Sequence, residues 1–264
     1  MPRRHGIAWL TTLSLDAPIV AIAWQHAIAH EFELGIQWHH RVLVFASVWL
    51  GYSADRWLDA WRHTANISFR HRFHGEHRWR LLAFWILLLA LSIAIATQLL
   101  TDAELASGLF LVAASIIATA IIQGIRLKAF QSLMKSMLTA ILLTGSILLF
   151  ARPPHQSDLL ATVLLLGSLF STNCCLIHFW DRPVDAIQEP NPATSRRLKS
   201  LTAMATLCLG FQASFYTFPI VPCVFASFGL LAALFGLQDR ISIETRRVLA
   251  DLSLIIPLFP LFSI

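Results

Sequence analysis

Nine apolar segments, most of them long enough to cross a membrane as a helix, dominate this sequence of 264 residues. A helix needs roughly 20 mostly apolar residues to span the hydrocarbon core of a bilayer. The composition agrees, because 56% of the residues are hydrophobic and only 13% are charged. The sequence therefore predicts an all-α integral membrane protein. Its predicted transmembrane helices are residues 7–29, 41–60, 79–100, 104–125, 133–151, 158–180, 199–217, 219–237 and 247–263.

Basic residues are distributed unevenly over the connections between these helices. Of the 20 Lys and Arg residues, 17 lie in the N-terminal segment or in the connections that follow the second, fourth, sixth and eighth predicted helices. The positive-inside rule places these connections and the N-terminus in the cytoplasm, and the C-terminus outside. We expect the protein in the inner (cytoplasmic) membrane of a bacterium. Topology thus accounts for the net charge of +5, and without a nucleic-acid-binding motif we expect no nucleic-acid partner.

The frame Asp-Arg-x-x-Asp occurs twice in a chain that otherwise contains few charges. Residues 55–59 read DRWLD and residues 181–185 read DRPVD, and together they hold four of the nine aspartates. Both frames lie at the predicted cytoplasmic ends of helices, the second and the sixth. Residues four apart share one face of a helix, so Asp55 and Asp59 are expected side by side.

The second frame contains a proline, which changes what is expected there. Pro183 disfavours the helical conformation at Arg182 and lacks a backbone N–H donor. We therefore expect the helix to end near Asp181 and Asp185 to lie on a loop. The two carboxylates of this frame then need not share a helical face.

Paired carboxylates at a membrane boundary need compensating charge. Like charges four residues apart destabilise a helix by about 0.2–0.5 kcal/mol even in water. Mg²⁺ is typically held by one or two carboxylates together with substrate phosphates. The two acid frames therefore favour a ligand with a Mg²⁺-bound polyphosphate head and an apolar tail. The alternative is that each pair only flanks a helix end and binds neighbouring Arg residues.

Three stretches of the sequence resemble the UbiA superfamily of intramembrane prenyltransferases. GYSADRWLDAWRHTAN resembles the first Asp-rich motif of that family and the loop after it, and NCCLIHFWDRPVDA resembles the second motif. LKAFQSLMKSMLTAILLTG resembles the basic segment before the fifth helix of the family. The resemblance covers essentially the whole chain. It implies one transmembrane domain, residues 1–264, folded as a UbiA-type helix bundle around a central cavity.

The resemblance also implies an activity and a set of site residues. The family uses Mg²⁺ to remove diphosphate from an allylic prenyl diphosphate and transfers the prenyl group to a hydrophobic acceptor, often an aromatic or lipid-like one. The partners implied are thus a prenyl diphosphate, an apolar acceptor and membrane lipid. The residues implied for catalysis and for holding the Mg²⁺ are Asp55, Asp59, Asp181 and Asp185. Those implied for substrate binding are Asn173, Lys135, Arg56 and Arg62.

The chain departs from the family motifs at several positions. Gly51 and Tyr52 stand where the first motif has Asn and Asp, and Ile177 stands where the second motif has its first Asp. Asn173, four residues before Ile177, is the candidate to take the place of that Asp. The chain resembles a divergent UbiA-like branch.

Two other functions are compatible with these features. One is a non-catalytic UbiA-like membrane protein that binds or carries a lipid. The other is a small transporter in which Asp16 and the acid pairs couple ion movement. Asp16 lies inside the first predicted helix, two residues before Pro18. An acid within a membrane helix indicates a functional site, and a kinked helix with a satisfied carboxyl group is the alternative.

Overall fold

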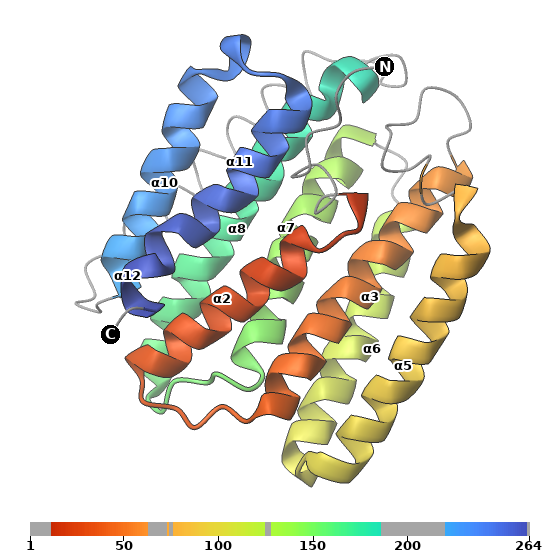
Figure 1. The fold of residues 1–264 in the computed structure, drawn as a ribbon, viewed down its shortest axis with the longest axis vertical. Helices are drawn as coiled ribbons and strands as arrows, with labels where there is room; N and C mark the ends of the chain where they lie inside the picture. The colour runs from red at the N-terminus through yellow and green to blue at the C-terminus, as the bar shows by residue number, and fades with distance from the viewer. Residues whose placement is uncertain (1–11, 63–72, 74–75, 125–127, 186–219, 263–264) are drawn as a thin grey trace.

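The computed structural model describes residues 12–62, 73, 76–124, 128–185 and 220–262, and all regular secondary structure in these ranges is helical. Figure 1 shows the helices packed side by side in one bundle. The α-helices are α2 (Asp16–Glu31), α3 (Trp38–Arg62), α5 (Arg78–Leu99), α6 (Asp102–Gly124), α7 (Lys128–Leu148), α8 (Gln156–Asp185), α10 (Ile220–Gly236), α11 (Ile243–Ile255) and α12 (Phe259–Phe262). The 3₁₀ helices are η1 (Gln238–Arg240) and η2 (Ile256–Leu258).

Helix α2 lies at the centre of the bundle and packs against α3, α7 and α11. Its sequence is rich in alanine, so neighbouring helices approach closely, and Ala21 and Ala27 are fully buried. Trp24 fills the larger space between helices and meets Phe170 of α8 edge to face, with ring centroids 6.2 Å apart. The core is therefore built on the helix that begins with Asp16.

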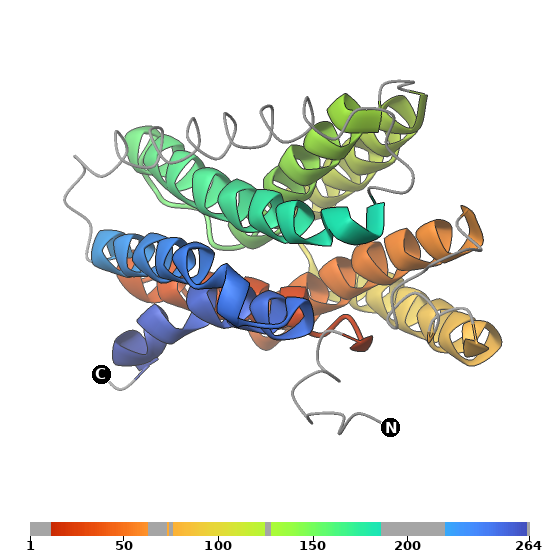
Figure 2. The same cartoon turned by 90° about the horizontal axis from the view of Figure 1, so that it is seen from above.

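Helices α5 and α6 are the most exposed part of the described structure. Helix α5 packs on α3 and has no buried residue, while α6 packs on α7. Figure 2 shows that these consecutive helices diverge, each following a different partner. Large apolar side chains such as Leu87, Phe110 and Ile116 are more than half exposed. Surfaces of this kind are stable in lipid, whose tails are as apolar as the side chains.

Three of the described helices are long and apolar enough to cross a membrane: α5, α6 and residues 156–180 of α8. The window within α8 is largely buried among other helices, whereas those of α5 and α6 are not. Residues 134–148 of α7 and the whole of α10 are shorter apolar helices. The described part of the chain is therefore all-helical and includes three candidate membrane-spanning helices.

Polar residues fix several helix ends. The backbone N–H of Thr101 donates to Glu104 Oε2 at 2.9 Å, and the N–H of Glu104 donates back to Thr101 Oγ1 at 3.3 Å, which caps the start of α6. Ser242 similarly accepts the N–H of Thr245 at the start of α11, at 3.3 Å. These caps stop the apolar helices at the edges of the bundle.

The structure corrects two predicted helices. The first was predicted from residue 7, but the chain is not helical at residues 13–15, where Ser14 has a φ of 59°. The last was predicted as one helix over 247–263, but α11 gives way to η2 and then to α12. Pro257 explains this break, because it lacks the N–H that would continue the α-helical hydrogen bonding. The predicted helix 199–217 lies outside the described residues.

Candidate functional site

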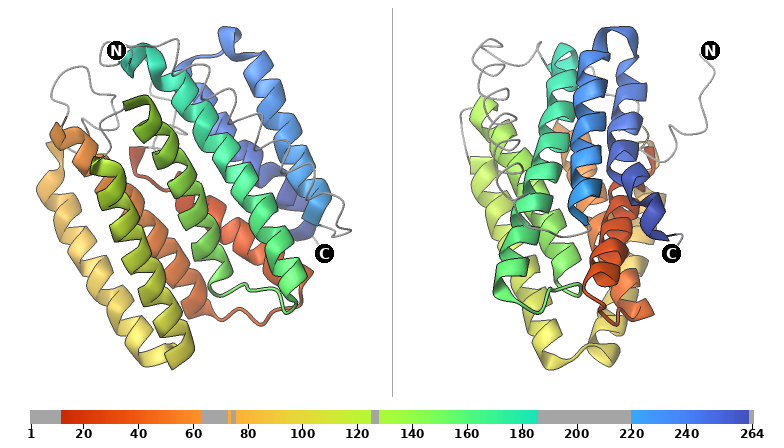
Figure 3. Two further views of the ribbon diagram at one scale, coloured as in Figure 1. Left: turned by 180° about the vertical axis from the view of Figure 1, so that it is seen from behind. Right: turned by 90° about the vertical axis from the view of Figure 1, so that its left-hand side faces the viewer.

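The two acid frames lie at the same end of the bundle. They occupy the last turns of α3 and α8, and Figures 1 and 3 show these two helix ends beside the N-terminal end of α7. The side chains of four predicted site residues are outside the described part of the structure: Asp59, Arg62, Asp181 and Asp185. The backbone alone therefore brings both frames to one region.

The second frame is helical throughout, so the predicted helix end near Asp181 is wrong. Helix α8 continues through Pro183 to Asp185. A proline removes one N–H donor from a helix, and here it does so only two residues before the helix ends. The loss is confined to the terminal turn, and the frame stays on the helix.

Asp55 forms an ion pair with Lys135 of α7. Lys135 Nζ lies 2.7 Å from Asp55 Oδ1, a distance typical of a charge-assisted hydrogen bond. The Asp55 side chain is 44% exposed and that of Lys135 is 30% exposed. The contact joins the first acid frame to Lys135, one of the residues that the resemblance implies for substrate binding. A carboxylate and an ammonium group are thus adjacent and both accessible to a ligand.

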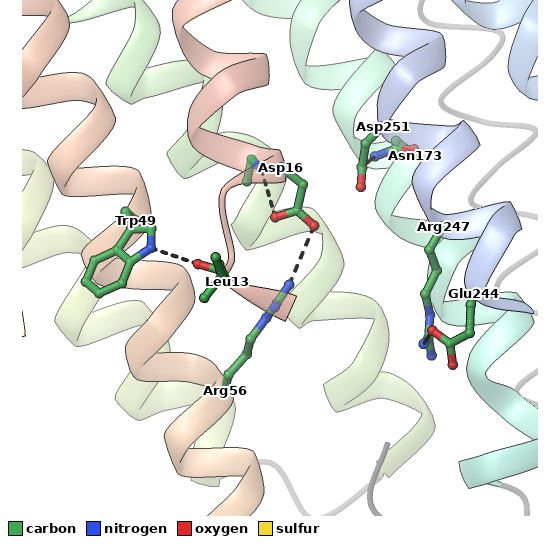
Figure 4. Close-up of polar contacts among 9 residues, drawn as sticks. Leu13, Asp16, Trp49, Arg56, Asn173, Glu244, Arg247 and Asp251 are labelled. Atoms are coloured by element: carbon green, nitrogen blue, oxygen red, sulfur yellow. Dashed lines mark hydrogen bonds and ion pairs between the residues drawn. The ribbon is translucent and has the colours of Figure 1, made fainter. Parts of the chain in front are cut away.

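Arg56 faces the interior of the bundle, away from this pair. It is 7% exposed, and its guanidinium lies 3.6 Å from Asp16 Oδ2 at the start of α2. Asp16 Oδ1 accepts the backbone N–H of Ala17 at 3.0 Å. Figure 4 shows the Arg56 side chain extending from α3 towards Asp16. The Asp16 carboxylate, 9% exposed, is therefore satisfied by two partners, and Arg56 is a structural partner of α2.

Asn173 is also buried, at 6% exposure, and contacts an acid that sequence reasoning did not identify. Its Nδ2 donates to Asp251 Oδ1 of α11 at 3.2 Å, as Figure 4 shows. Asp251 was overlooked although it lies alone in a predicted transmembrane segment, the signal that had singled out Asp16. Arg247, one turn before it, had been counted only for topology, yet it is 4% exposed and lies 3.4 Å from Glu244.

Tyr52 lies on α3, one turn before Arg56. It stands where the UbiA motif that the chain resembles has an Asp, and it is partly buried against the core. Its phenol is within electrostatic range of Asp16, Arg56 and Asp251. The interior polar cluster, defined as Asp16, Tyr52, Arg56, Asn173 and Asp251, thus draws on α2, α3, α8 and α11.

The predicted Mg²⁺ site lies in the two acid frames. Among the described side chains, no three or more His, Cys, Asp or Glu residues are grouped to hold a metal ion. Of the four predicted Mg²⁺ ligands, only Asp55 has its side chain among those described. Its accessible carboxylate fits the way Mg²⁺ is held beside a substrate phosphate, by one or two carboxylates and several waters. Asp55 is therefore the described residue that would hold such an ion.

The described contacts bring Asp55 together with Lys135, and Arg56 together with Asp16, but they leave Asn173 with Asp251 in the interior. The resemblance to the UbiA superfamily is a prediction that rests on the motifs quoted above. Comparison of the chain with models of protein families, with curated proteins and with solved structures finds no match.

Proposed function

We propose that this chain is an intramembrane enzyme that transfers a prenyl group from a prenyl diphosphate to an apolar acceptor, with Mg²⁺ held by the acid frames. One observation carries the proposal. The Asp55 carboxylate and the Lys135 ammonium, 80 residues apart in sequence, lie 2.7 Å apart at the bundle end where both acid frames lie. This juxtaposition supplies the two kinds of group that a metal-bound diphosphate requires.

The two groups have complementary roles in this proposal. Asp55 would hold Mg²⁺ together with substrate oxygens, and Lys135 would neutralise part of the remaining phosphate charge. An accessible ion pair contributes only about 0–1 kcal/mol, so exchanging it for contacts with the ligand costs little. The apolar helices that continue from this end offer surroundings for a prenyl tail.

Charge development explains why such a site would accelerate transfer. As the bond from the prenyl carbon to the diphosphate oxygen breaks, negative charge concentrates on the departing diphosphate. A cation placed there stabilises this transition state more than the ground state. Bound Mg²⁺ supplies that stabilisation, while Lys135 is already positioned beside Asp55.

The experiment measures transfer from labelled farnesyl diphosphate to a panel of aromatic acceptors by the purified protein in lipid nanodiscs, with Mg²⁺ or with EDTA. We expect turnover only with Mg²⁺, and a rate at least about 10²-fold lower for Asp55→Asn or Asp181→Asn. Asp102→Asn is the control, since Asp102 is exposed at the start of α6. Turnover that is unaffected by EDTA would contradict the proposal.

A non-catalytic lipid-binding protein is the second candidate, and one observation favours it. The family motif has an acid where this chain has Tyr52, and the adjacent Arg56 is committed to Asp16 in the interior. Fewer charged groups then face the ligand. Mg²⁺-dependent binding of farnesyl diphosphate without turnover on any acceptor would support this candidate.

A further inference from the structure

One hydrogen-bond acceptor of the interior polar cluster, Asn173 Oδ1, has no partner among the described residues. Asn173 is 94% buried, and while its Nδ2 donates to Asp251, its Oδ1 has no donor among the described residues. A buried acceptor without a donor costs about 1–3 kcal/mol. An amide oxygen beside a carboxylate, in an apolar bundle, is a polar position that a ligand would complete.

The neighbouring groups restrict what that ligand presents. Asp251 and Asp16 are carboxylates, which accept hydrogen bonds when ionised, and Arg56 already faces Asp16. Tyr52 lies within electrostatic range of both acids. Added negative charge would be repelled here, whereas an O–H or N–H donor would satisfy Asn173 Oδ1 and approach Asp251.

The apolar surroundings restrict the rest of the molecule. Leu176 on α8 and Leu254 on α11 are buried within a turn of Asn173 and Asp251. Apolar side chains therefore adjoin both polar residues, and the hydroxyl groups of the neighbouring Thr172 and Ser253 donate to backbone carbonyls of their own helices. A small polar head on an apolar body matches this environment.

We propose that Asn173 and Asp251 bind the hydroxyl or amino head of an apolar molecule, with Asp16 and Tyr52 beside it. On the proposed function, on which this identification of the ligand rests, that molecule is the prenyl acceptor. The structure thereby assigns a role to α11, whose Asp251 lies outside both acid frames.

The spacing along α8 leaves room for both substrates of the transfer, with the diphosphate near Asp181 and the acceptor head near Asn173. Asn173 precedes Asp181 by eight residues, which is about 12 Å along a helix. That distance accommodates a metal-bound diphosphate at the helix end and an acceptor head two turns deeper. In the transfer, the acceptor oxygen or nitrogen forms a bond to the prenyl carbon as the carbon–oxygen bond to diphosphate breaks. The acceptor proton passes to Asp251, and the diphosphate leaves with both electrons of the broken bond.

A matched pair of probes tests for the donor. 4-Octylphenol and its methyl ether differ by the O–H, and their binding is measured by calorimetry in detergent micelles, with protein-free micelles as the blank. We expect the wild-type protein to bind the phenol at least about tenfold more tightly than the ether, because the ether cannot donate a hydrogen bond to Asn173 Oδ1. Equal affinities would overturn the proposal without any variant being needed.

Two variants test whether Asn173 and Asp251 form the binding site for the phenol. Asn173→Leu and Asp251→Asn are expected to reduce the preference for the phenol to less than about threefold, since each weakens an acceptor. Asp158→Asn, at the opposite end of α8, is the control that keeps the full preference. A tenfold preference that survives in both folded variants would place the donor elsewhere and overturn the proposal.

Binding of labelled farnesyl diphosphate to wild type, with Mg²⁺ or EDTA, is measured in parallel. If farnesyl diphosphate does not bind in the presence of Mg²⁺, the proposed function is contradicted. The comparison of the phenol with its ether still decides whether Asn173 and Asp251 bind a hydroxyl group.

Discussion

Asp55 and Arg56 are neighbours in the sequence, yet they form ion pairs in different environments. The side chains of Asp55 and Lys135 are 44% and 30% exposed, whereas those of Asp16 and Arg56 are 9% and 8% exposed. Consecutive residues of an α-helix point about 100° apart. One turn of α3 therefore faces both the accessible end of α7 and the bundle interior. The same motif supplies one residue to an accessible ion pair and the next residue to a buried one.

The difference in exposure determines which pair can serve a ligand. An accessible pair is screened and contributes about 0–1 kcal/mol. Removing one member of a buried pair leaves a charge in an apolar interior and costs about 3–5 kcal/mol. Asp55 can therefore exchange Lys135 for a metal and a phosphate, while Arg56 cannot leave Asp16 at comparable cost. Of the cations predicted to bind diphosphate, Lys135 is the better placed.

The largest effect expected from this comparison is on stability. Asp16→Asn keeps the shape of the side chain but leaves Arg56 without its described carboxylate. We expect the free energy of unfolding to fall by about 3–5 kcal/mol, measured by denaturation in detergent. The double variant Asp16→Asn/Arg56→Met should be less destabilised than the sum of the two single variants. Additive effects would show that the two side chains do not depend on each other.

The sequence predicted most of the helices because the apolar segments are long and their ends are charged or contain turn-forming residues. Helices α3, α5, α6 and α10 begin and end within a few residues of the predicted positions. The break in the last predicted helix was visible as Pro257 but was not used. The positive φ of Ser14 had no signal of its own, because packing of the neighbouring helices determines where the chain turns.

The candidate site was predicted less completely than the fold. The structure brings together Asp55 and Lys135, two of the predicted site residues, while their roles stay predictions. The partner of Arg56 could not be predicted, since it depends on how α2 packs against α3. Asp251 was overlooked because it does not belong to a repeated frame, although a lone acid in an apolar helix is itself an indication of function.

The next prediction separates function from stability on the accessible side of α3. Asp55→Asn is expected to lower the rate of prenyl transfer by at least about 10²-fold while changing the free energy of unfolding by no more than about 1 kcal/mol. The same protein preparation is used for the transfer assay and for denaturation. If the loss of rate were matched by a loss of several kcal/mol of stability, Asp55 would be a structural residue like Asp16.

A third prediction extends the comparison to a buried polar group that is uncharged and has no partner among the described residues. Gln25 of α2 is 1% exposed, and neither its Nε2 nor its Oε1 has a hydrogen-bond partner in the described part of the chain. Gln25→Leu should raise the free energy of unfolding by about 1–3 kcal/mol, because an unsatisfied buried amide is removed. Gln98→Leu, at an exposed position of α5, should change it by less than about 0.5 kcal/mol. A destabilised Gln25→Leu would indicate that the amide has a partner beyond the described residues.

The smallest expected effect concerns the Asp55–Lys135 pair itself. A double-mutant cycle with Asp55→Asn and Lys135→Met should give a coupling free energy of about 0–1 kcal/mol, because both side chains are partly solvated. Added salt should reduce even this, since the screening length falls from about 10 Å at 0.1 M to about 3 Å at 1 M. The same cycle on Asp16 and Arg56 serves as the reference, because a buried pair is screened much less. A coupling of several kcal/mol that persists in 1 M salt would show that Asp55 is held as firmly as Asp16. In that case its exchange for a metal-bound diphosphate would no longer cost little, and the argument for Lys135 as a ligand-binding cation would fail with it.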